Sequence, residues 1–365
     1  MPTSQDTVRR EDQGAPRARL VGVDATRGLA VLGMFAAHVG AAGPDFWAGT
    51  GWLQVADGRS AATFAMLAGL SAALLSGGPV PAEGAALRFA RVRILVRAAL
   101  LVPIGVVLIA LGTPVAVILP AYAVMFALLV LVLRVPPAWL VAAAGAVAVV
   151  GPPLALAGRA VLPGADSGLS QPVDVLVGQH YPVVVWSAYL LVGLAVGRLD
   201  LAAPTTSRRL AVVGAVALVA GYGTSAVALR VLPESATVLR ALLTAEPHAD
   251  TLPEVVGNLG VSLLVLALLL AVGRRAPAVL VPVAATGALA LTAYVVHVVV
   301  IAALGDDAVF GPENGDLVAF VVVTVVATTA WRAALGRGPL ERALHRVSTD
   351  AARLDAERRA VRAGR

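Results

Sequence analysis

Long runs of apolar residues constrain this chain more than any other feature of its sequence. A helix of about 20 mostly apolar residues can cross the hydrocarbon core of a bilayer, and we identify ten such runs in the 365 residues. They lie near residues 22–42, 60–77, 94–112, 114–133, 138–157, 182–199, 209–229, 256–273, 278–304 and 316–336. The runs do not alternate apolar and polar residues as the strands of membrane barrels do. The sequence therefore predicts an all-α, polytopic transmembrane bundle of about ten spans.

The composition agrees with this class of protein. Hydrophobic residues make up 59% of the chain and charged residues 14%, whereas soluble domains average roughly 45–50% and about 25%. Cysteine is absent, which excludes disulfides and thiolate catalysis. Aromatic residues amount to only 5%, which disfavours nucleic-acid readout by base stacking. We therefore expect the lipid bilayer as a partner and no nucleic acid.

Arginine supplies every basic side chain, and its placement predicts the orientation of the chain. Short cytoplasmic loops of membrane proteins carry an excess of arginine and lysine. With the N-terminus in the cytoplasm, only four arginines fall on the outer side: Arg59, Arg159, Arg230 and Arg240. This predicts that both termini are cytoplasmic. We divide the chain into a disordered basic arm (1–18), a membrane domain (19–337) and a basic amphipathic tail helix (338–365), which lies either on the inner leaflet or in solvent.

Ionisable residues in the first predicted span form a stripe along one face of the helix. Asp24, Arg27 and His38 fall at three- and four-residue steps through Val31 and Met34, so they share one face. Because such residues are expensive in lipid, the stripe should line the interior of the bundle. Asp24 and Arg27 form either a structural ion pair or part of a substrate site. His38 lies roughly 16 Å further along the helix, toward the outer side, as either a buried structural histidine or a base.

Other histidines converge on the same outer side when this topology is applied. His180, His248 and His297 approach the level of Asp57 and Arg59. Histidine is the usual general base near neutral pH, and a carboxylate can orient it. We predict an outward-facing, proton-handling site, with chance convergence as the alternative. A metal site from His180, His248 and Asp57 has no supporting ligand spacing, so we expect no metal.

The predicted inner side carries a cluster of arginines between the second and third spans, made up of Arg88, Arg91, Arg93 and Arg97. Topology alone can account for this positive charge. A sharper hypothesis is a docking site for a phosphorylated cytoplasmic donor, because guanidinium forks match phosphate.

Several stretches carry a resemblance to a known family. RLVGVDATRGLAVLGMFAAHVG and VADGRSAATFAMLAGLS resemble the opening of the heparan-alpha-glucosaminide N-acetyltransferase-like membrane acyltransferases, and more closely their bacterial YeiB-type relatives. YPVVVWSAYLLVGLAVGRL, EPHADTLPEVVGNLGVSL and ALALTAYVVHVV resemble later segments of the YeiB-type proteins. The resemblance implies acyl transfer from cytoplasmic acyl-CoA to an acceptor on the far side. In the glycosaminoglycan enzymes an essential histidine follows the first span, but GAAGPDFWAGTGWLQVAD contains none here, so His38 or His248 would supply that role.

Our first hypothesis is therefore an acyltransferase domain over 19–337, with acetyl-CoA as the expected donor at the inner arginines. His38, Asp57, His248 and His297 are the predicted catalytic residues; His38 acts as base or attacks the thioester, and Asp57 orients a histidine or the acceptor. The predicted substrate-binding residues are Asp24, Arg27, Arg59, His180 and Tyr181.

The alternatives are a proton-coupled transporter that uses Asp24, Arg27 and His38 as a relay, and a structural membrane protein. The absence of lysine and the abundance of alanine, glycine and arginine suggest a GC-rich bacterial gene. We therefore predict a multi-pass protein of the bacterial cytoplasmic membrane that acts on an extracytoplasmic sugar or other envelope acceptor. A homodimer is left open.

Overall fold

A computed structural model describes residues 20–164 and 171–363. Every regular element in these two stretches is a helix, which confirms the all-α prediction. The longer helices are α2 (Val21–Val39), α3 (Arg59–Leu75), α4 (Gly84–Ala110), α5 (Leu119–Leu129), α6 (Pro137–Val161), α8 (Val183–Val196), α9 (Pro204–Val231), α11 (Leu252–Arg275), α13 (Ala290–Leu304), α15 (Asn314–Leu335) and α16 (Pro339–Ala363). Shorter ones are η1 (Gly51–Ala56), α7 (Pro172–Val177), α10 (Thr237–Leu243), η2 (Pro277–Leu280), α12 (Val281–Ala288) and α14 (Asp307–Phe310). The predicted arm at 1–18 lies outside the described residues.

The helices are those of a multi-pass membrane protein. Six segments are long and apolar enough to cross a bilayer: η1 with α3, and α4, α6, α9, α11 and α15. The pair α12 and α13, bent by 66°, would be a seventh. A helix or helix pair occupies each of the ten predicted runs, but α5 and α8 have only 11 and 14 residues. The number ten therefore stays a prediction.

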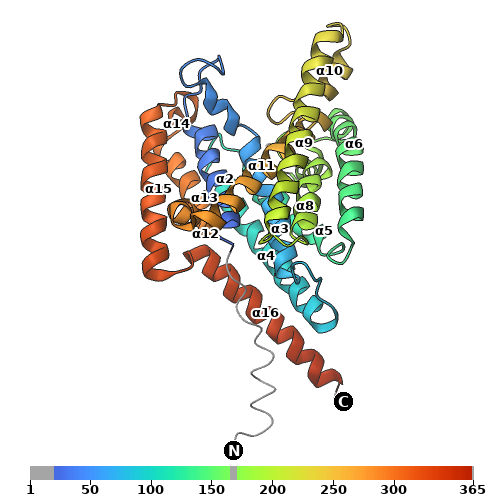
Figure 1. The fold of residues 1–365 in the computed structure, drawn as a ribbon, viewed down its shortest axis with the longest axis vertical. Coiled ribbons are helices and arrows are strands. Elements are labelled where there is room, and N and C mark those ends of the chain that lie inside the picture. Colours follow the sequence, from blue (N-terminus) through green and yellow to red (C-terminus); the bar gives the residue numbers. More distant parts are fainter. Residues whose placement is uncertain (1–19, 165–170, 364–365) are drawn as a thin grey trace, which may run out of the picture.

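The two ends of the bundle carry different elements (Figure 1). The start of α2 and the helix α16 lie at one end, which we call the inner end. The opposite end, which we call the outer end, carries α10 and α14. That the inner end faces the cytoplasm remains a prediction.

Helix α2 is held by close contact with α12. A Cβ atom added at Gly28 would clash with the carbonyl of Val283, and one added at Gly287 would clash with the carbonyl of Asp24. Small residues allow helix backbones to approach closely in membrane proteins. The first turns of α2, with Asp24 and Arg27, are thereby fixed against the start of the bent pair α12 and α13.

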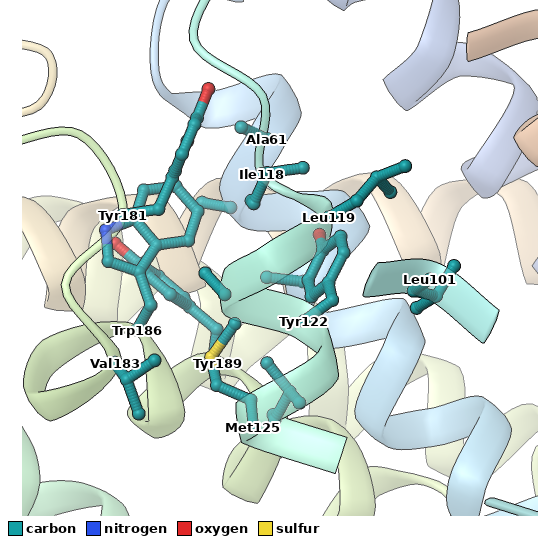
Figure 2. Packing of buried hydrophobic residues seen from close by; sticks show 14 of the residues in the cluster. Ala61, Leu101, Ile118, Leu119, Tyr122, Met125, Tyr181, Val183, Trp186 and Tyr189 are labelled. Atoms are coloured by element: carbon teal, nitrogen blue, oxygen red, sulfur yellow. The ribbon is translucent and has the colours of Figure 1, made fainter. Parts of the chain in front are cut away.

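A buried cluster of aromatic residues fills the space between α5 and α8 (Figure 2). Tyr181, Trp186 and Tyr189 come from α8 and the residues before it, and Tyr122 comes from α5. The Tyr181 and Trp186 rings meet edge to face with centroids 4.9 Å apart. This rigid packing forms one wall beneath the outer-end loops.

Helices α15 and α16 are attached to the bundle in different ways. Of α15, only Leu317 and Thr328 are buried, so most of its apolar surface is left for lipid. The tail helix α16 lies across the inner end and packs against α4, with Ser348 and Ala352 buried. Its placement on the inner leaflet stays a prediction.

Candidate functional site

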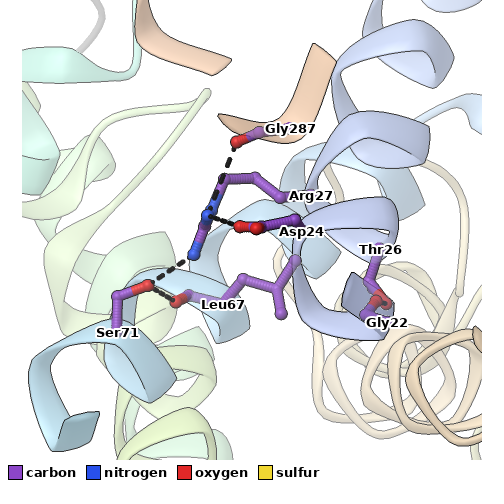
Figure 3. Close-up of polar contacts among 7 residues, drawn as sticks. All are labelled: Gly22, Asp24, Thr26, Arg27, Leu67, Ser71 and Gly287. Atoms are coloured by element: carbon purple, nitrogen blue, oxygen red, sulfur yellow. Dashed lines mark hydrogen bonds and ion pairs between the residues drawn. The ribbon is translucent and has the colours of Figure 1, made fainter. Parts of the chain in front are cut away.

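A cavity of about 270 Å³ opens near the inner end, between α2, α3, α4, α5 and α16. Arg27 lines it and is held in place by the neighbouring helices (Figure 3). Its guanidinium contacts Asp24 Oδ1 at 3.1 Å, Ser71 Oγ at 2.8 Å and the Gly287 carbonyl at 3.5 Å. The ion pair expected from the sequence is therefore present, and it fixes Arg27 on the wall of the cavity.

The four arginines of α4 do not form one cluster. Arg93 and Arg97 lie one helical turn apart on one face, and Arg97 lines the inner cavity and donates to Ser348 Oγ at 3.4 Å. Arg88 lines a different cavity, between the start of α4 and the end of α16. The reason is helical geometry, because residues 88 and 93 are separated by about 1.4 turns at 3.6 residues per turn. The four arginines are close together in the sequence, but a helix points them in different directions, so they need not form one continuous patch.

The positive charges of Arg93 and Arg97 are not paired with carboxylates. Arg97 interacts electrostatically with Arg93, Arg337 and Arg27, and no carboxylate in the described chain lies within salt-bridge distance of Arg93 or Arg97. Burial and the neighbouring arginines lower the pKa of His345 on α16. An excess of guanidinium groups around a cavity suits a phosphate or another anion.

The one carboxylate that lines this cavity already has partners. Glu341 of α16 accepts from the backbone N–H and the hydroxyl of Thr292, at 2.9 and 2.6 Å. It therefore ties α16 to the first turn of α13, where its charge also favours the helix N-terminus.

A pair of histidines connects α2 and α13 toward the outer end. The Nδ1 atom of His38 lies 3.0 Å from the Nε2 atom of His297, and the rings are nearly parallel, with centroids 5.3 Å apart. Phe35 and Tyr294 pack against His297 at centroid distances of 4.8 and 5.2 Å. One ring must donate and the other accept, since a neutral imidazole has one of each.

The second nitrogen of His297 suggests which ring donates. Its Nδ1 atom makes no hydrogen bond to the described residues and is held near the carbonyls of Ala293 and Tyr294. A proton on that nitrogen leaves Nε2 of His297 to accept from Nδ1 of His38. In this tautomer Nε2 of His38 carries the lone pair, which is what a general base needs.

The third histidine of the site, His248, lies in a constrained loop above α11. His248 and Asp250 adopt left-handed backbone angles, with φ values of 61° and 57°. Glu254 holds both residues by accepting their backbone N–H groups at 2.9 and 2.7 Å. Trp186 donates its indole N–H to Asp250 at 2.7 Å. Left-handed residues of this kind carry strain and persist only where surrounding contacts impose them.

The His248 ring is packed against aromatic side chains. It stacks on Trp186 and meets Tyr181 edge to face, with centroid distances of 6.2 and 5.6 Å. It also lies close enough to His38 for their charges to interact. Burial, with a smaller contribution from His180, lowers the pKa of His248 to about 4, so the ring is neutral near pH 7. Burial and the nearby Glu254 raise the pKa of Asp250 well above its usual range.

Arg59 and Asp57 belong to a neighbouring network and not to the histidine pair. Arg59 donates to the Tyr222 hydroxyl at 2.8 Å, and this hydroxyl donates to Asn258 at 2.6 Å. Asn258 in turn donates to Glu254 at 3.3 Å, and Asp57 interacts electrostatically with Arg59. Within the described residues no hydrogen bond or ion pair joins His38 to Asp57 or Arg59. The network reaches His248 through Glu254.

Several residues of the site were missed at the level of sequence. Glu254 and Asn258 lie four residues apart in an apolar run, so their shared helix face was a signal that could have been used. Tyr122 and Tyr294 are ordinary-looking aromatic residues in apolar helices, and the sequence gives no comparable signal for them. No group of three His, Cys, Asp or Glu residues in the described part of the chain could hold a metal ion.

Comparison with known families gives these features a context. Residues 19–239 match the family described as heparan-alpha-glucosaminide N-acetyltransferase, catalytic. The chain belongs to this family. Residues 196–350 also match a family described as a protein of unknown function, DUF418, which agrees with the resemblance to YeiB-type proteins. A search of curated proteins finds no match. Family membership indicates a membrane transferase, and the pair His38–His297 takes one residue from each matched region.

Proposed function

We propose that the protein transfers an acyl group, in the first instance acetyl, from acyl-CoA at the inner end to an amine or hydroxyl acceptor at the outer end. The observation that carries the proposal is that buried tyrosines lie between the cationic inner cavity and the His38–His297 pair. Tyr122 lines the cavity, Tyr294 packs against His297, and the two are close enough to interact electrostatically. A donor held at the inner end would therefore point toward the histidines.

The inner cavity supplies what the donor needs. The phosphates of CoA would meet Arg93 and Arg97, with Arg27 further inside, since guanidinium groups bind phosphate through paired donors. Arg27 and His38 are eleven residues apart on α2, or roughly 16 Å at the rise of an α-helix. An extended phosphopantetheine arm spans this distance. The donor-binding role predicted for Arg88 is weaker within this proposal, because Arg88 lines another cavity. The same holds for Arg91, which lies three residues from Arg88 and so on the same face of α4.

The chemistry would take place where the arm ends. His38 Nε2 takes the proton from the acceptor as its nitrogen or oxygen attacks the thioester carbonyl. The new C–N or C–O bond forms, the C–S bond breaks, and the CoA thiolate leaves and takes up the proton. The Tyr122 hydroxyl makes no hydrogen bond to described residues, so it could stabilise the developing oxyanion, whereas the Tyr294 hydroxyl lies near the Ile118 carbonyl. His297 keeps His38 in the tautomer that accepts the proton.

The other residues predicted from the sequence would line the acceptor site or hold the structure around it. His180, Tyr181 and His248 form the wall of the outer end above the pair, and Arg59 with Asp57 holds the Glu254 network that shapes this wall. Asp24 fixes Arg27. We find no observation that favours the transporter hypothesis, and the family description names a transferase.

The test is an acetyl-transfer assay on protein reconstituted in lipid vesicles. Because the chain has no cysteine, single cysteines at Arg275 on the inner end and at Glu234 on the outer end report orientation by labelling. Radiolabelled acetyl-CoA is added to one side, with glucosamine or dioleoyl-phosphatidylethanolamine as acceptor. We expect acetyl transfer only when acetyl-CoA reaches the inner end. Transfer from the outer end, or absence of acetyl-CoA binding, would overturn the proposal.

A further inference from the structure

A second cavity leads to the histidine pair from the side of the bundle. It has a volume of about 310 Å³ and lies between α13 and α15, with His297 among its lining residues. Its rims are apolar side chains that protrude from the protein; Val296, Leu304 and Val323 are exposed by 53%, 55% and 65%. In a membrane-embedded helix pair such a surface faces lipid. This groove, which we call the lateral groove, therefore connects the bilayer with the reacting pair.

The helix that forms one wall of the groove is tethered above and below it. Asn314 accepts from the backbone N–H of Ala41 at 3.0 Å, and Thr328 bonds to Thr286 at 2.9 Å. Between these tethers Phe320 contacts Phe35, which packs against His297. Contacts above and below the groove therefore hold α15 in position beside α13.

The lateral groove carries acidic charge at its outer end. Asp316 lines it, and Asp306, Asp307 and Glu313 lie in the adjoining segment, whereas residues 276–331 contain no arginine or lysine. At the base of the groove is His297, with only 2% of its surface exposed, which is bonded to the proposed base His38 at 3.0 Å. An apolar channel that has an acidic rim and ends at the His38–His297 pair fits a lipid with a cationic headgroup that can give up a proton.

We propose that the lateral groove binds a lipid with a primary-amine headgroup, which is the acceptor of the acyl group. The proposal rests on the function proposed above and names its substrate class. The tail of the lipid would lie in the bilayer against α13 and α15, and its ammonium group would be drawn to Asp316. The deprotonated amine then attacks the thioester, which gives an N-acyl lipid and free CoA.

A second groove on the other side of α15 provides an internal contrast. It is lined by Leu317 and Val321 of α15 and by residues of α2, α3 and α11, has a volume of about 410 Å³ and contains no histidine. Its charged residue is Arg59, so its charge does not attract an amine. Of these two grooves, it is the lateral groove that combines a lipid-facing opening, an acidic rim and access to His297.

The binding test needs no turnover. A bimane label is attached to a single cysteine at Val300, which lines the lateral groove, or at Val322, which is exposed on α15 outside it. Quenching by brominated phosphatidylethanolamine is compared with quenching by brominated phosphatidylcholine, which has no primary amine. We expect the amine lipid to quench at least about twofold more strongly at Val300 and equally at Val322, and Asp316→Asn to remove the difference. Equal quenching at Val300, or a difference that survives Asp316→Asn, would overturn the proposal.

A transfer assay then separates this inference from the proposed function. Acetyl transfer to dioleoyl-phosphatidylethanolamine is compared with transfer to glycerophosphoethanolamine, which has the same headgroup and no tail. Preference for the lipid supports the inference, whereas equal rates overturn it and leave the acyltransferase intact. Selective quenching without transfer to either compound or to glucosamine would overturn the proposed function and, with it, the role of the bound lipid as acceptor.

Discussion

The inner and outer ends of the bundle both concentrate polar residues, but they organise them in opposite ways. At the inner end, Arg97 lines a cavity and Arg93 lies near Arg97, and neither has a carboxylate partner in the described residues. At the outer end, His248, Glu254 and Asn258 are shielded and joined by hydrogen bonds. An excess of positive charge is suited to binding an anion. Buried groups that are joined by hydrogen bonds are suited to moving protons.

This contrast suggests a division of labour along α2. Arg27, fixed by Asp24 and Ser71, belongs to the binding end, and His38, paired with His297, belongs to the reacting end. A substitution at one end should therefore change one kinetic property and spare the other. Substitutions at the two ends test whether these properties are separate.

The largest effect is expected from loss of the base. His38→Ala should lower the rate of acetyl transfer by about 10²-fold or more, the scale of general-base assistance, while the affinity for acetyl-CoA changes less than about twofold. Transfer rate and calorimetric affinity measure the two quantities separately, and added imidazole should restore part of the rate. A parallel loss of CoA affinity would show that the two ends are not separate.

At the inner end we expect a smaller effect, on the affinity for acetyl-CoA and not on the rate of transfer. Arg97→Gln should weaken acetyl-CoA binding by roughly tenfold, because a charged hydrogen bond to phosphate is worth about 1.4 kcal/mol or more. Arg91→Gln removes the same charge from the same helix and should have less than about a twofold effect. Isothermal titration at low and high salt measures both variants. Equal losses would instead favour the single four-arginine cluster expected from the sequence.

The network of the outer end can be tested by its contribution to stability. Glu254→Gln leaves a single side-chain oxygen to accept from the two backbone N–H donors, of His248 and Asp250, so one of them then faces an NH2 group. The loss of a buried acceptor should cost about 1–3 kcal/mol of unfolding free energy. Glu246→Gln in the same loop segment is the control, because Glu246 is exposed. Thermal unfolding in detergent should separate the two variants; equal stability would mean that Glu254 does not hold the loop.

Sequence patterns predicted the helices better than they predicted the grouping of residues within the site. Apolar runs are local, so each of the ten runs coincides with a helix or a helix pair, although the bend before Ala290 was not foreseen. The stripe from Asp24 to His38 follows from helix periodicity alone and is present in α2. Which residues meet across helices depends on tertiary packing. The sequence alone therefore could not show whether His38 contacts His297 or Asp57.

The stability of the protein should depend on pH through the His248 loop, which lies outside the spans. Burial lowers the pKa of His248 from 6.5 to about 4, so between these values the unfolded chain binds a proton that the folded chain excludes. Stability must therefore fall as pH falls through this window. Between pH 6.5 and 5.5 the contribution of this one group amounts to about 1 kcal/mol.

Other titratable groups, namely His180 and the carboxyl groups of Asp250 and Glu254, also lie next to the His248 ring or its loop. The measurement is therefore the difference between the protein and His248→Asn, since asparagine tolerates the left-handed backbone at this position. We expect the Asn variant to lose less stability than the unaltered protein when the pH of a thermal unfolding series is lowered from 6.5 to 5.5. If the two curves run parallel, the His248 ring is accessible to protons in the folded state, and the outer end is then hydrated like the inner end, which would remove the contrast between them.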